Sequence, residues 1–172
     1  WQIQPNGITI EEVLNKTLSD FLKEEIHIIG ASRTDSGVHS FGNVAVFDTK
    51  SRIPAEKISY ALNQRLPEDI VVQKSEEVPA DFHPRHCDSR KTYEYRILNR
   101  EFPLPMYRNN TYFCYRKLDL EKMQQAAEYL RGEHDFKSFC SNPQMKKSTV
   151  RIVDSIEIVR KKDYIYFNFH GT

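Results

Sequence analysis

Segments with helical and strand periodicity alternate along this sequence, and their order confines the chain to a fold in which helices pack on sheets. In the first half, Thr9 and Glu12 form a capping box, which predicts a helix as far as about residue 25. A second helix is predicted from Pro54, and Pro67 ends it. Apolar, β-rich runs predict three strands, at residues 26–29, 43–49 and 70–74. The first half therefore has the order helix, strand, strand, helix, strand.

The second half begins with residues 91–99, whose apolar and aromatic side chains alternate with polar ones and predict a strand. Asp119 is placed to cap a helix, and Gly132 suits its exit. Two further strands are predicted at residues 150–160 and 164–169, on either side of a Lys-Lys-Asp turn. This half therefore has the order strand, helix, strand, strand.

Both orders are parts of a split β-α-β-β-α-β unit, the topology of ferredoxin-like and RRM-like domains. We therefore expect an α/β (α+β) protein in which two such halves, residues 1–88 and 89–172, form one mostly antiparallel sheet. A strand before Trp1 would complete the first unit, and a helix and a strand after Thr172 would complete the second. We accordingly expect the chain to be truncated at both ends.

The two halves carry charge of opposite sign. Residues 1–88 contain 9 Lys and Arg against 14 Asp and Glu, a balance of −5, whereas residues 89–172 contain 16 against 10, a balance of +6. The excess of basic residues in the second half favours a polyanionic partner such as nucleic acid, although a solvated basic face is the alternative interpretation.

Several classes of protein are disfavoured by composition. No apolar run approaches the roughly 18 residues that span a bilayer, and the first residues lack the features of a signal peptide. The three cysteines, Cys87, Cys114 and Cys140, have no Cys-x-x-Cys spacing. His83 and His86 lie close to Cys87, but no fourth metal ligand is evident. We expect a cytoplasmic protein with no membrane segment, no metal and no cofactor.

The segment between the first two predicted strands, residues 30–42, contains more reactive side chains than a turn requires. A purely structural interpretation is that Asp35 forms an Asx turn, Gly37 supplies a positive φ and Arg33 pairs with Asp35 at the surface. The order Arg33-Thr34-Asp35-x-Gly37-Val38-His39, however, resembles the central signature of TruA-type tRNA pseudouridine synthases.

The resemblance extends along nearly the whole chain and in the correct order, so it is far more specific than one short motif. The further matching segments are Trp1-Gln2-x-Gln4-Pro5-x-Gly7-x-Thr9-Ile10-Glu11, Asn63-x-x-Leu66-Pro67-x-Asp69-Ile70, Asp81-Phe82-His83-x-Arg85, Lys91-x-Tyr93-x-Tyr95 and Gly132-x-His134-Asp135-Phe136-x-Ser138-Phe139. A later family motif, which carries an arginine that closes the active site, would follow His170 and is not in this sequence.

The resemblance implies isomerisation of uridine to pseudouridine in tRNA, without cofactor or metal, by a homodimer that acts on positions 38 to 40 of the anticodon stem-loop. It implies that Asp35 is the nucleophile, through attack on either the ribose or the base, and that Arg33 keeps it charged. Tyr93 is implied to stack on the flipped uracil and to handle a proton, in a cleft between the halves. The positions expected to contact the RNA are Thr34, Gly37, His39, Arg85, Lys91 and Tyr95.

Two other functions compete with this interpretation. Asp35-Ser36-Gly37 resembles the catalytic triplet of aspartic proteases, but Arg33 opposes the shared proton of their paired carboxylates, and three helices do not suit their β-rich lobes. A non-catalytic RNA-binding module also fits two split β-α-β-β-α-β halves with aromatic residues on the sheet. Only the Arg33-Thr34-Asp35 segment distinguishes an enzyme from such a module.

Overall fold

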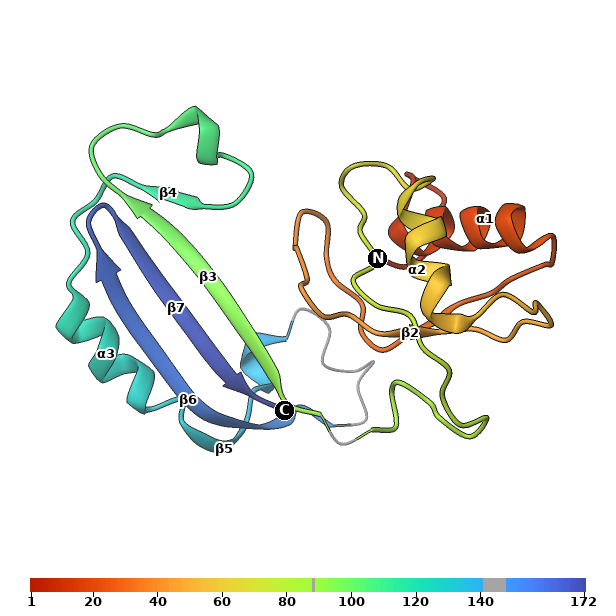
Figure 1. Cartoon of the computed structure of the whole chain (residues 1–172). Helices are drawn as coiled ribbons and strands as arrows, with labels where there is room; N and C mark the ends of the chain where they lie inside the picture. Colours follow the sequence, from red (N-terminus) through yellow and green to blue (C-terminus); the bar gives the residue numbers. More distant parts are fainter. Residues whose placement is uncertain (88, 141–147) are drawn as a thin grey trace. The chain divides into compact units, whose positions relative to one another are not determined.

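The computed structural model of the chain describes residues 1–87, 89–140 and 148–172. The chain divides into two compact units, Trp1–Cys87 and Asp88–Thr172 (Figure 1). Unit 1 contains α1 (Ile10–Leu22), β1 (Ile29–Gly30), β2 (Ala45–Val46) and α2 (Ala55–Asn63). Unit 2 contains β3 (Lys91–Asn99), the 3-10 turn η1 (Pro105–Tyr107), β4 (Tyr112–Cys114), α3 (Leu120–Glu128), β5 (Gly132–Asp135), the 3-10 turn η2 (Lys137–Phe139), β6 (Val150–Lys161) and β7 (Tyr164–Gly171).

Helix α1 begins where its sequence predicts and ends at Leu22, before the expected residue 25. The Thr9 hydroxyl accepts a hydrogen bond from the Glu12 amide at 3.3 Å, which satisfies one of the unpaired donors of the first turn. Its C-cap, Lys23, takes a left-handed conformation with φ of 57°. The apolar stripe of α1 then packs with α2 and residues 26–28, so the core of unit 1 is aliphatic. Its buried members are Leu14, Leu18, Leu22, Ile26, Ile28, Ile58 and Leu62.

The strands of unit 1 are shorter than the sequence predicts. β1 and β2 pair over two residues each, Ile29 with Val46 and Gly30 with Ala45. Residues 70–74 are not a strand, so that prediction is wrong. The backbone of Val72 instead bonds the side-chain amide of Asn63, through its N–H at 2.8 Å and its carbonyl at 2.9 Å. A side chain of α2 therefore supplies the partners that a neighbouring strand would have supplied.

Unit 2 is built on a five-stranded sheet with the order β4-β3-β7-β6-β5. β3 and β4 are parallel and the other neighbours are antiparallel, so the predicted mixed α/β class with a mostly antiparallel sheet is confirmed. The described strands nevertheless form two separate sheets, one in each unit, rather than a single one. The sequence pattern also missed β4 and β5, which are short and, in β5, wholly exposed.

Helix α3 covers part of one face of this sheet. The Asp119 carboxylate accepts a hydrogen bond from the Lys122 amide at 3.2 Å, which is the predicted cap. Ala127 of α3 packs against Ile97 of β3, Ile158 of β6 and Ile165 of β7. Because side chains alternate along a strand, Tyr93, Tyr95 and Asn99 lie on the same face of β3 as Ile97.

Candidate functional site in two structural units

The motif with Asp35 lies in a loop that joins β1 to β2 and is closed at its base (Figure 1). The Ala31 amide donates to the Val44 carbonyl at 2.7 Å, and the Asn43 side-chain amide donates to the Ser32 carbonyl at 3.2 Å. Further out, the Val38 amide donates to the Asp35 carbonyl at 3.2 Å. These bonds make the loop an ordered extension of the hairpin.

Gly37 permits the turn that follows Asp35. Its φ is +79°, a left-handed value that a side chain would strain. No heavy atom lies within 4 Å of a Cβ built at this position, so the requirement for glycine is conformational rather than steric. The residue type at position 37 therefore follows from backbone geometry.

Two residues from distant parts of unit 1 fasten the base of the loop. The backbone nitrogen of Trp1 donates to the Thr34 carbonyl at 3.0 Å, and the Trp1 ring packs on Gly30 so closely that an added Cβ would lie 2.7 Å from it. Arg85 donates from Nε to the Gly30 carbonyl at 2.8 Å, in a partly buried position. In this structure Arg85 thus holds the loop, and its expected contact with RNA stays a prediction.

The charged side chains of the loop are exposed to solvent. Arg33, Asp35 and His39 are all exposed, and among the described residues Arg33 and Asp35 form no ion pair. Because an exposed ion pair contributes only about 0–1 kcal/mol and requires two side chains to be ordered, its absence here is physically reasonable. The Asp35 carboxylate is therefore accessible to a substrate.

Phe41 is a member of this loop that the sequence reasoning missed. Its side chain is 96% exposed, although a large apolar side chain gains nothing from contact with water. It lies between His39 and the base of the loop, close in sequence to Asp35. A lone aromatic residue in a polar loop is the signal that would have identified it as a possible stacking partner for a base.

In unit 2, Tyr93 lies near the start of β3, directly opposite Phe169 of β7. Its side chain is 58% exposed and that of Tyr95 is 51% exposed, so neither belongs to the closed core. A hollow of about 220 Å³ adjoins Tyr93 and is lined by aromatic rings with two cationic side chains at its border. Those lining residues are Phe136, Phe169, Lys91 and Arg151. Lys91 thus lies beside Tyr93, whereas Phe136 and Arg151 were not anticipated as site residues.

The residues considered for a metal site do not form one. The His83 and His86 rings stack with their centroids 4.0 Å apart, and Cys87 Sγ lies 3.4 Å from the His83 carbonyl oxygen. Across residues 1–87, 89–140 and 148–172, no three His, Cys, Asp or Glu side chains are arranged to hold a metal ion. In the same part of the chain, no helix is long and apolar enough to cross a membrane.

Comparison with known proteins connects this loop to one family. The family model for tRNA pseudouridine synthase matches residues 1–86 and 126–172, which include the whole Asp35 loop. The chain belongs to this family. It is 46% identical over 165 residues to tRNA pseudouridine synthase A of Thermoanaerobacter sp. (strain X514), a match that covers 96% of this chain and 68% of that protein.

Two further members of the family show similar relationships. The enzyme of the same name from Acetivibrio thermocellus is 42% identical over 171 residues, covering 99% of this chain and 70% of the relative. tRNA pseudouridine synthase A 2 of Clostridium perfringens is 46% identical over 158 residues, covering 92% and 65%. These alignments span most of both units, so the predicted resemblance to TruA-type synthases is confirmed. Asp35-Ser36-Gly37 lies within the part of the chain that the family model matches.

Proposed function

We propose that this chain isomerises uridine to pseudouridine in tRNA, with Asp35 as the nucleophile. The observation that carries this proposal is the closed loop that presents the Asp35 carboxylate to solvent, in a chain whose relatives are named tRNA pseudouridine synthases. The reaction breaks the bond between N1 and the ribose anomeric carbon and forms one from C5 to the same carbon. It involves no net oxidation, so a protein nucleophile and proton transfers suffice.

Asp35 can act in either of two ways. Its carboxylate can attack the anomeric carbon and displace uracil through N1, or it can add to the base and loosen the glycosidic bond. In both routes the uracil turns, C5 bonds the anomeric carbon and the carboxylate is regenerated. The hydrogen on C5 leaves as a proton and N1 gains one, so atoms and charge balance.

Tyr93 and Arg33 have complementary parts in this proposal. The half-exposed ring of Tyr93, beside an aromatic hollow, is suited to stack on an extruded uracil, and a tyrosine hydroxyl is a group that can take part in the transfer of the C5 proton. The exposed Arg33 guanidinium is free to pair with Asp35 or with a substrate phosphate once RNA displaces water. Contacts of Thr34, Gly37, His39, Tyr95, Lys91 and Arg85 with the RNA belong to the same proposal.

The finer features are proposed with it: action on positions 38 to 40 of the anticodon stem-loop, a homodimer, a cytoplasmic location, and tRNA lying on the basic residues after position 88. The excess of six positive charges in residues 89–172 supports the last feature. Mass spectrometry of tRNA from a deletion strain, with and without the restored gene, would identify the modified uridines. Light scattering during gel filtration would give the oligomeric state.

The central experiment is Asp35→Asn, which removes the nucleophilic charge and barely changes volume. Isomerisation is followed by release of tritium from C5 of labelled uridine in tRNA. We expect product to fall to background while tRNA binding and the circular dichroism spectrum are retained. Asp48→Asn, at an exposed aspartate of the same unit, is the matched control and should retain activity.

An Asp35→Asn rate within tenfold of the parent would remove Asp35 from the nucleophile role. Tight binding of tRNA by the parent without any product would instead indicate a non-catalytic RNA-binding module.

A further inference from the structure

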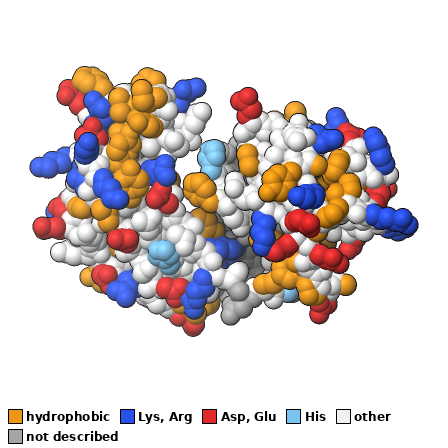
Figure 2. All heavy atoms as spheres, viewed as in Figure 1, with side chains coloured by type: hydrophobic (Ala, Val, Ile, Leu, Met, Phe, Trp, Pro, Cys, Tyr) orange, Lys and Arg blue, Asp and Glu red, His pale blue; other side chains and the backbone are white. Residues whose placement is uncertain are grey.

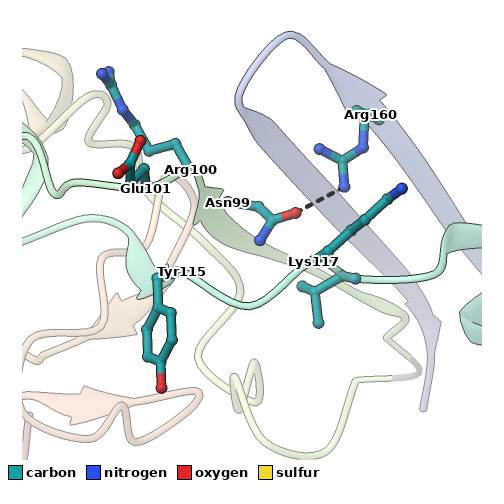
Figure 3. Close-up of a pocket in the computed structure, with 7 residues that line it drawn as sticks. Asn99, Arg100, Glu101, Tyr115, Lys117 and Arg160 are labelled. Carbon is teal, nitrogen blue, oxygen red and sulfur yellow. Dashed lines mark hydrogen bonds between the residues drawn. The ribbon is translucent and has the colours of Figure 1, made fainter.

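A second hollow lies at the opposite end of β3 from Tyr93. Its volume is about 570 Å³, and its lining includes Asn99, Arg100, Tyr115, Lys117 and Arg160, shown in Figure 3. We call it the Arg160 pocket. It is built from the end of β3, the segment between β4 and α3, and the end of β6. The pocket therefore lies within unit 2 and is separate from the hollow at Tyr93.

Asn99 organises this pocket. Its side-chain Nδ2 donates to the carbonyls of Cys114 at 2.8 Å and Arg116 at 2.7 Å, and its Oδ1 accepts a bond from Arg160 Nη2 at 2.8 Å (Figure 3). Asn99 thereby links the segment after β4 to β6 and orients one edge of the Arg160 guanidinium. Because an oriented side chain loses less conformational freedom on binding, Arg160 is prepared for a ligand.

The charge at the lining favours an anion. The lining contains three cationic side chains, those of Arg100, Lys117 and Arg160, and one carboxylate, that of Glu101. Arg100 is partly neutralised by Asp163, since Arg100 Nη1 and Asp163 Oδ2 are 3.5 Å apart. Lys117 is exposed and makes no ion pair within the described part of the chain. Lys117 and the remaining edge of the Arg160 guanidinium can therefore bind phosphate oxygens.

The position of the pocket points to an RNA phosphate rather than a free anion. Asn99 and Tyr93 lie on the same face of β3, six residues and so about 20 Å apart. Between them on the sheet lie the exposed rings of Tyr95 and Tyr112, whose centroids are 6.4 Å apart. Figure 2 shows hydrophobic side chains gathered on unit 2, with Lys and Arg side chains, and some Asp and Glu side chains, beside them. Aromatic rings bordered by cations are typical of surfaces that bind nucleic acid.

We propose that the Arg160 pocket binds a backbone phosphate of the tRNA whose target uridine lies at Tyr93. This inference rests on the proposed function. Arg160 and Lys117 would then anchor the substrate at a distance from the chemistry. Their loss should raise KM and leave kcat unchanged, because the pocket lies about 20 Å along β3 from Tyr93.

The test compares Arg160→Ala, Arg160→Lys and Lys117→Ala in the full-length protein with Lys57→Ala, an exposed lysine of α2 in the acidic unit 1. Filter binding gives the Kd for tRNA from 50 to 200 mM salt, and tritium release gives kcat and KM. We expect Arg160→Ala and Lys117→Ala each to weaken binding roughly tenfold at low salt and to reduce the log–log salt slope by about one. Arg160→Lys should recover part of both effects, and Lys57→Ala should have neither.

Unchanged salt slopes for both pocket variants would overturn the inference, as would equal effects from Lys57→Ala. Binding of inorganic phosphate that is lost in Arg160→Ala, while this variant binds tRNA as tightly as the parent, would make the pocket a site for free anions and would also overturn the inference. The two proposals can fail separately. If the parent protein binds tRNA but forms no pseudouridine, the proposed function fails; if the pocket variants still reduce the salt slope of tRNA binding in that case, the phosphate site stands.

Discussion

Gly30→Ala tests whether packing at the base of the loop supports the active site. A Cβ added to Gly30 would lie 2.7 Å from Trp1 Cζ2 and 2.8 Å from Cε2 and Nε1. Carbon atoms prefer separations of about 3.5–4.0 Å, so the indole or the strand must move by about 1 Å. Trp1 packs against the core of unit 1, which resists that movement. Overpacking of this kind typically costs about 1–3 kcal/mol, and we expect a loss of unfolding free energy in that range.

Two measurements follow the effect of this substitution. Urea unfolding gives the change in free energy, and fluorescence reports the indole directly, because Trp1 is the only tryptophan among the 172 residues. We expect the emission of Trp1 to shift toward that of a solvated indole. The isomerisation rate should fall as well, because both residues also hold the loop: Trp1 donates a hydrogen bond to the Thr34 carbonyl, and the Gly30 carbonyl accepts one from Arg85.

Gly42→Ala is the matched control at the other end of the same loop. No atom lies within 4 Å of its added Cβ, and its φ is not in the left-handed region, so stability should be unchanged or slightly higher. Gly30→Ala with a free energy of unfolding within about 0.5 kcal/mol of the parent and an unshifted spectrum would refute the proposed packing constraint.

Two further predictions concern exposure. Phe41→Ala should leave the free energy of unfolding unchanged, because the side chain is 96% exposed. It should lower kcat/KM for tRNA roughly tenfold, whereas Phe41→Tyr should retain activity. An alanine variant as active as the parent would exclude a stacking role for Phe41. Ile165→Ala, at a fully buried position of β7, should destabilise unit 2 by about 2–5 kcal/mol in urea unfolding. Ile8→Ala, at an 85% exposed position, should have almost no effect, and a similar loss in both variants would contradict the assignment of the core.

Local signals in the sequence were sufficient for the helices and the long strands. Thr9 and Asp119 cap α1 and α3 because their side chains satisfy amides only three residues away. The alternation of residues 91–99 predicted β3 because one face of a strand repeats every second residue. The order of residues around Asp35 likewise predicted the family, since a motif in a single loop is readable without knowing its surroundings.

Features that depend on partners far along the chain were decided by the tertiary structure. Residues 70–74 have a strand-like composition, but Asn63 satisfies the backbone of Val72, so no strand forms there. β5 has no apolar alternation, and it exists because β6 pairs with it. The backbone hydrogen bonds of a strand are made with a neighbouring strand, and the local sequence of a segment does not show which neighbour it will have.

The same distinction holds within the two sites. Sequence alone predicted that Asp35, Arg33 and Tyr93 matter, through the motifs that contain them. It did not predict that Arg85 holds the Gly30 carbonyl, 55 residues away, or that Asn99 orients Arg160 across 61 residues. A hydrogen bond of this kind forms only when folding brings both groups to within about 3 Å, and a linear pattern contains no record of that proximity.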